Sequence, residues 1–109
     1  MRQIVLLDPN PTHAKRIADA LTAIACRTLR CADVESAAKM LAAAQADLMA
    51  VVPGPSEDWR VVVARLREAM HRAGVAEHGP IICLLPRPYR GPEERVFAAR
   101  RGVRIIYER

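Results

Sequence analysis

Aromatic residues are scarce in this sequence: phenylalanine, tyrosine and tryptophan together make up 4% of its 109 residues. Proteins that bind single-stranded nucleic acid usually stack successive bases on aromatic side chains, and this chain offers few rings for such stacking. No recognised nucleic-acid-binding motif is present either. The composition therefore disfavours a nucleic-acid-binding function.

Long apolar runs are also missing. No stretch approaches the roughly 20 apolar residues that a membrane-spanning helix needs. The apolar run at residues 4–7 stops at Asp8 and is too short for the core of a signal peptide. We therefore expect a cytoplasmic protein that does not enter a membrane.

Motifs that would hold a cofactor or a metal are absent. Neither GxGxxG nor GxxxxGKS occurs, and the segment Pro53-Gly54-Pro55 has too many prolines to present a run of backbone N–H donors to a phosphate. The cysteines are odd in number and lack CxxC spacing, and the histidines share no ligand spacing. We expect no cofactor, no metal, and cysteines that act as small buried apolar residues. The cysteines are Cys26, Cys31 and Cys83, and the histidines are His13, His71 and His78.

Short apolar segments alternate with segments of helical periodicity along the chain. Several of the apolar segments are apolar throughout, which indicates strands buried on both faces of a parallel sheet between helix layers. A chain of this length forms one domain, residues 1–109. The sequence thus predicts an α/β fold, a three-layer, doubly wound, parallel five-stranded sheet. Strands are expected at 4–7, 27–31, 48–52, 81–85 and 103–107, and helices at 14–24, 34–44, 59–73 and 92–101.

Four stretches of the chain, in this order and spacing, resemble bacterial response-regulator receiver domains. IVLLDPNP is similar to the first strand and its acidic cluster, and CRTLRCADVESAAKMLAAAQADLMAVV to the second strand through the third. GPIICLLP is similar to the fourth strand, and RRGVRIIYER to the last turn and the fifth strand. The resemblance covers essentially the whole chain and implies flavodoxin-like topology, with strand order 2-1-3-4-5.

The resemblance also implies a phosphorylation pocket, which this chain does not preserve. Receivers place two acidic residues after the first strand to bind Mg²⁺, a cation that prefers carboxylate oxygens. Asp8 matches the first acidic position, but Pro9 stands at the second and offers no ligand. Asp8 is then a candidate metal ligand on its own, although a lone carboxylate before Pro-Asn-Pro is more typical of a turn or helix cap.

The phosphoacceptor, hydroxyl and lysine positions of a receiver are changed as well. The acceptor position falls on Val52, or on Met49 if Pro53-Gly54 is aligned with the Pro-Gly pair of the family. The hydroxyl position falls on Leu85 and the lysine position on Arg109. Without a nucleophile the aspartyl phosphorylation of receivers cannot occur.

We therefore expect a non-enzymatic pseudo-receiver that acts by binding proteins, as an adaptor or as the N-terminal regulatory module of a bacterial regulator. Receivers usually add a fifth helix after the fifth strand, whereas this chain stops with the strand. The sheet face beside the first helix is then expected to be open and to contact a second copy or another domain. The expected interface residues are Ile17, Leu21, Ile24, Val103, Ile105 and Tyr107.

The distribution of charge leaves an alternative function open. Residues 55–109 carry eleven Lys or Arg against seven Asp or Glu, a balance that favours an acidic partner. A basic patch could bind nucleic acid, or simply be solvated. A small α/β enzyme is the remaining alternative, with Asp8 the one titratable group expected at the switch point between the first and third strands. The expected basic residues are Arg87, Arg90, Arg95, Arg100, Arg101 and Arg104.

Overall fold

Five strands alternate with four helices in the computed structural model, which describes residues 2–75, 78–85 and 92–107. The side chains of Pro92 and Glu93 are outside this description. The elements are β1 (Arg2–Leu7), α1 (Pro11–Thr22), β2 (Cys26–Cys31), α2 (Val34–Ala43), β3 (Leu48–Val51), α3 (Trp59–Arg72), β4 (Ile81–Leu85), α4 (Pro92–Ala99) and β5 (Val103–Tyr107). None of the helices in these ranges is long and apolar enough to cross a membrane.

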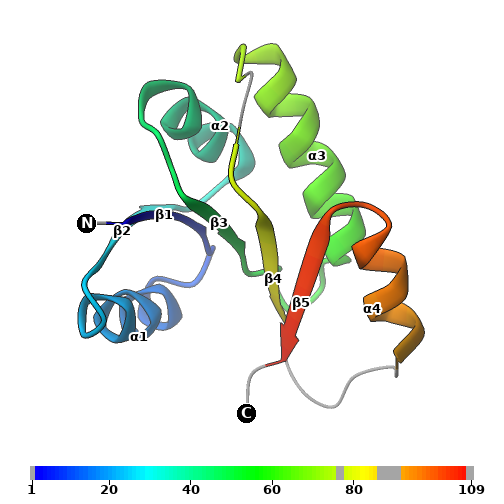
Figure 1. Ribbon diagram of the computed structural model, residues 1–109, viewed down its shortest axis with the longest axis horizontal. Coiled ribbons are helices and arrows are strands. Elements are labelled where there is room, and N and C mark those ends of the chain that lie inside the picture. Colours follow the sequence, from blue (N-terminus) through cyan, green and yellow to red (C-terminus); the bar gives the residue numbers. More distant parts are fainter. Residues whose placement is uncertain (1, 76–77, 86–91, 108–109) are drawn as a thin grey trace.

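The strands form one parallel sheet with the order β2-β1-β3-β4-β5 (Figure 1). Leu7, at the end of β1, pairs with Cys31 in β2 and with Val51 in β3. The carboxyl ends of these strands therefore meet at the same edge of the sheet. The predicted doubly wound sheet and its strand order are confirmed.

Polar residues cap the helices where the sequence places turn chemistry. Asn10 caps α1 by accepting hydrogen bonds from the backbone N–H groups of Thr12 and His13. Asp33 caps α2, and Asp58 caps α3. These caps satisfy backbone donors that no helical partner reaches, and they begin each helix just beyond a strand end.

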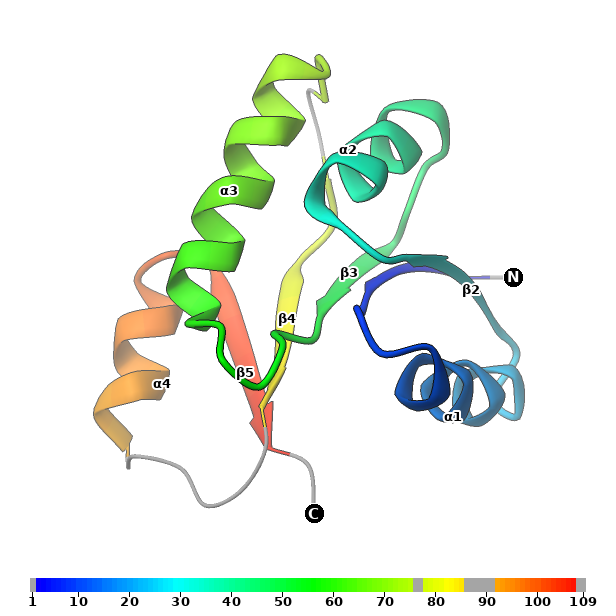
Figure 2. The same ribbon diagram turned by 180° about the vertical axis from the view of Figure 1, so that it is seen from behind.

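Helices cover the two faces of the sheet unequally. α2, α3 and α4 lie on one face, whereas α1 lies on the other (Figures 1 and 2). Val5 and Leu7 point to the three-helix face and join the large core cluster, whereas Ile4 and Leu6 join a smaller cluster under α1. This alternation along one strand follows from the two-residue repeat of β-structure.

The same alternation overturns part of the expected interface. Val103 and Ile105 are 3% and 6% exposed and belong to the large cluster, and Tyr107 packs against it. These side chains lie under the helices, so they cannot form the open face. The predicted strand is confirmed, but the predicted interface takes the wrong alternate residues of β5, because a shift of one residue along a strand moves each side chain to the opposite face.

The open face of the sheet is formed by the other residues of β4 and β5. Ile82 and Leu84 alternate with the buried residues of β4 and are half-buried, and Ile106 is 43% exposed. Of the expected interface residues on α1, Ile17 and Leu21 pack against the smaller cluster. Ile24, just beyond the helix, is 69% exposed. No helix in the described ranges covers β4 and β5 on this side (Figure 2).

Candidate functional site

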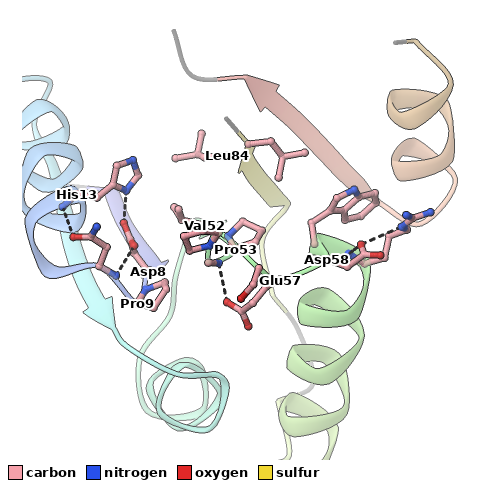
Figure 3. Close-up of a pocket in the computed structure, with 15 residues that line it drawn as sticks. Asp8, Pro9, His13, Val52, Pro53, Glu57, Asp58 and Leu84 are labelled. Atoms are coloured by element: carbon pink, nitrogen blue, oxygen red, sulfur yellow. Dashed lines mark hydrogen bonds and ion pairs between the residues drawn. The ribbon is translucent and has the colours of Figure 1, made fainter. Parts of the chain in front are cut away.

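A cavity of about 670 Å³ opens at the carboxyl ends of β1, β3 and β4. Its walls come from the turn after β1, the start of α1, the segment between β3 and α3, and the end of β4 (Figure 3). Parallel α/β sheets bind ligands at this edge, where strand order reverses between β1 and β3. The cavity is therefore the place where a phosphorylation site would lie. The residues that line it and carry the argument below are Asp8, His13, Val52, Glu57, Leu84 and Leu85.

Asp8 is fully buried at this edge of the sheet, with 0% exposure. Its Oδ1 accepts a hydrogen bond from the backbone N–H of Asn10 at 2.9 Å, which closes the turn that precedes α1. Its Oδ2 lies 2.5 Å from Nδ1 of His13, in the first turn of α1 (Figure 3). Arg30 donates two hydrogen bonds to the backbone carbonyl of Asp8, at 3.1 and 2.9 Å. Both carboxylate oxygens are therefore engaged within the protein.

The position that follows β3 is occupied by Val52. Its backbone N–H donates to the carbonyl of Leu7 at 2.8 Å, so it lies at the cavity edge beside the end of β1. Met49 is 1% exposed in the middle of the same strand and belongs to the core under the helices. Of the two candidates for the acceptor position, Val52 therefore lies at the cavity and Met49 does not. An isopropyl side chain has no atom that accepts a phosphoryl group.

Two of the remaining expected pocket residues, Pro9 and Leu85, carry no reactive group in their side chains. Pro9 is exposed at the turn and carries no oxygen in its side chain. Leu85 is 3% exposed and packs into the large core, while Leu84 faces the α1 side of the cavity (Figure 3). Arg109 lies outside the described residues.

The far side of the cavity carries acidic groups that hold the local backbone. Oε1 of Glu57 accepts a hydrogen bond from the backbone N–H of Gly54 at 2.7 Å. Asp58 caps α3 and pairs with Nε of Arg60 at 3.1 Å. Within residues 2–75, 78–85 and 92–107, no group of three or more His, Cys, Asp or Glu side chains is arranged to hold a metal ion.

The cysteines behave as buried apolar residues. All three are free; Cys31 and Cys83 are buried and Cys26 is partly buried. Burial raises the pKa of the Cys83 thiol to about 12 and also raises the pKa of the Cys31 thiol. A thiol that stays protonated is a poor nucleophile and a poor metal ligand.

Of the four expected basic residues that the structure describes, Arg104 lies apart from the three that belong to or follow α4. Arg104 alternates with Val103 and Ile105 on β5 and so points to the open face, away from α4. The guanidinium of Arg95 lies 4.9 Å from the centre of the Tyr107 ring, and that of Arg101 lies 3.5 Å from the centre of the Phe97 ring. Arg100 is exposed just after α4, and the expected residues Arg87 and Arg90 lie outside the described part of the chain.

No family model matches this chain, and no curated protein matches it significantly. Several solved structures, however, match it over essentially its whole length. A response regulator receiver domain protein from Clostridium thermocellum has a TM-score of 0.73 and 12% identity, over 99% of this chain and 82% of its own. The Francisella response regulator 1452 receiver domain has a TM-score of 0.74 and 14% identity, over 99% and 84%. The N-terminal domain of a response regulator receiver protein from Methanoculleus marisnigri JR1 has a TM-score of 0.74 and 18% identity, over 100% and 85%.

These likenesses extend over essentially the whole chain, and the strand order agrees with them. The chain therefore has the fold of a response-regulator receiver domain. The predicted resemblance is confirmed at the level of the fold, which is what identities this low establish.

His13 is the site residue that sequence reasoning missed. Ligand spacing among the histidines does not reveal its role, because the partner of His13 is a carboxylate five residues earlier rather than another histidine. A usable signal was present: Pro11 is the first residue of α1, so residue 13 lies in the first turn, where its side chain reaches back toward the end of the preceding strand.

Proposed function

We propose that this protein is a receiver-fold signalling domain that is not phosphorylated, is not an enzyme, and acts by binding other proteins. The observation that carries the proposal is the residue after β3: Val52 stands at the cavity edge where a receiver needs its acceptor carboxylate. It would serve as an adaptor or as the regulatory module of a larger bacterial regulator.

The chemistry of phosphoryl transfer supports this proposal. Transfer to an aspartate needs a nucleophile, a divalent cation and a positive group near the developing charge. Here the nucleophile position is apolar, and the second metal position is Pro9. Asp8, the carboxylate at the end of β1, already accepts from the backbone and pairs with His13. A fold without these groups retains the surfaces of a receiver but not its reaction.

Incubation with acetyl phosphate and Mg²⁺, followed by intact-mass measurement, tests this proposal. We expect no phosphoryl adduct, and no change in Trp59 fluorescence on adding beryllofluoride and Mg²⁺, because Trp59 lines the cavity and would report a bound acceptor analogue. A phosphorylatable receiver domain treated in parallel is the positive control. A stoichiometric adduct on this chain would overturn the proposal.

For the open sheet face we propose a second copy of this chain as the partner. The face presents Ile82, Leu84 and the 43% exposed Ile106, and large apolar patches are rarely left uncovered on soluble monomers. A two-fold contact brings the same patch of both copies together, so these apolar side chains can pack against their counterparts beside Arg104, which lies on the same face. Multi-angle light scattering at micromolar concentration is the test, and a mass that stays at one chain would overturn the dimer.

A further inference from the structure

One face of α3 carries a row of basic residues toward α4. Arg60 and Arg67 are separated by seven residues, or two helical turns, and so lie on one side of α3. Both reach across to the end of α4. The guanidinium of Arg60 lies 5.5 Å from the centre of the Phe97 ring, and that of Arg67 donates to the backbone carbonyl of Arg101.

Arg101 completes this row from the other side. Its guanidinium lies 3.5 Å from the centre of the same Phe97 ring, and its Nη1 donates to the Phe97 carbonyl at 3.4 Å. Stacking on the ring restricts the motion of a side chain that is otherwise exposed and long. Arg60, Arg67 and Arg101 thus form one pre-oriented group, which we call the arginine seam.

Two of the three arginines of this seam lack an acidic partner within the described residues. Among the described residues no carboxylate forms an ion pair with Arg67 or Arg101, while Arg60 pairs with Asp58. The side of α3 that faces α2 is different, because Arg72 pairs there with both Glu35 and Glu68, at 2.8 and 3.0 Å. Arg67 and Arg101 are held close together by the contact of the Arg67 guanidinium with the Arg101 backbone, so a negative partner would relieve the repulsion between these two charges.

The surroundings of the seam favour a protein partner over a nucleic acid. Phe97 is already covered by two guanidinium groups, and Trp59 is 3% exposed, so neither ring is available for a base to stack on. Val96, which precedes Phe97 in α4, is 54% exposed and leaves an apolar side chain on the surface of the same helix. Guanidinium groups bind carboxylates through paired hydrogen bonds, which specify an acidic side chain well.

We propose that the arginine seam is the docking site for an acidic, partly apolar segment of a partner protein. This inference rests on the proposed function, because it names the kind of partner that the protein-binding domain takes. The site lies between α3 and α4, separate from the open face assigned above to a second copy.

Fluorescence anisotropy with a labelled peptide of glutamates and interspersed leucines tests the proposal on the full chain. We expect saturable binding that weakens with added salt and that falls about tenfold or more in Arg67→Gln/Arg101→Gln. The matched control is Arg16→Gln/Arg65→Gln, which removes the same charge from exposed positions elsewhere and should bind like the wild type. Circular dichroism checks folding, and Arg101→Gln alone replaces the double variant if that variant unfolds.

Three results would overturn the proposal that the arginine seam is a docking site. They are no binding of the peptide by the wild-type protein, an equal loss in the control variant, and tighter binding of a labelled oligothymidylate than of the peptide. A phosphoryl adduct in the experiment above would instead overturn the proposed function, so the two failures are distinguishable.

Discussion

Nδ1 of His13 lies 2.5 Å from Oδ2 of Asp8, joining the first turn of α1 to the end of β1. The Asp8 side chain is 1% exposed and the His13 side chain 16% exposed, so this contact is largely shielded from water. The resemblance to receivers implies that a cation binds carboxylates at this strand end in that family. Here the imidazole of His13 occupies one oxygen of the Asp8 carboxylate and joins the strand end to the helix.

Removing the imidazole should destabilise the fold. In His13→Ala the buried Oδ2 of Asp8 loses this partner, and an unsatisfied buried acceptor costs about 1–3 kcal/mol. Urea denaturation measures the change in the free energy of unfolding. His71→Ala, at an exposed position near the end of α3, is the control and should change stability by less than about 0.5 kcal/mol. Equal effects of the two changes would mean that the contact with Asp8 contributes nothing.

Adding carboxylates beside Asp8 should allow the protein to bind Mg²⁺, whether or not it also allows phosphorylation. Pro9→Asp/Val52→Asp adds acidic groups beside Asp8 at the cavity edge, where carboxylate oxygens suit Mg²⁺. We expect Mg²⁺ to change the fluorescence of Trp59, the one tryptophan of the chain, in this variant but not in the wild type. Pro9→Asn/Val52→Asn has similar size and polarity without the charge. A response in the asparagine variant, or none in the aspartate variant, would contradict this geometry.

Alkaline pH should destabilise the protein through Cys83. Burial raises the pKa of this thiol from 9.0 to about 12, so the folded state holds the proton more tightly than the unfolded chain does. The stabilisation is complete below pH 9.0 and is lost as the pH rises toward about 12. The loss is at most about 1.4 kcal/mol for each pH unit in that window. Free energies of unfolding measured across it should fall less steeply in Cys83→Val than in the wild type.

Cys26→Val is the control for this pH dependence, because Cys26 is a partly buried cysteine near the start of β2. In Cys26→Val, the fall in the free energy of unfolding with rising pH should be as steep as in the wild type. If Cys83→Val keeps the full alkaline loss, other groups cause it and Cys83 does not.

A polar residue on the open face should weaken self-association. Ile106→Ser removes the most exposed apolar side chain of β5, and light scattering across a concentration series should show the dimer dissociating at about tenfold higher concentration. Val61→Ser changes a similarly exposed apolar residue, 46% exposed on α3, and should leave the dimer constant unchanged. Association that is unaffected by Ile106→Ser would place any contact elsewhere.

Much of the site could be inferred without coordinates. Apolar runs bounded by Pro, Gly and Asp locate the strands, and parallel strands must end at one edge, so Asp8, Val52 and Leu85 could be assigned to one region. The absence of a carboxylate at residue 52 needs no structure at all. The choice between Val52 and Met49 did need one, because it depends on which residue ends β3 and which lies within it.

Composition and periodicity by themselves determined the class of fold and its strands, because those follow from local patterns. The lack of a carboxylate at residue 52 is read directly from the sequence, and the resemblance to receivers implies that this is the acceptor position. Tertiary structure alone decided which alternate residues of β5 face the helices, and that His13 meets Asp8. It also decided that Arg60 and Arg101 lie over Phe97, that Arg67 contacts the backbone of Arg101, and that Arg104 points away. These relationships depend on the parity of a strand and on contacts between elements distant in sequence, neither of which a local pattern specifies.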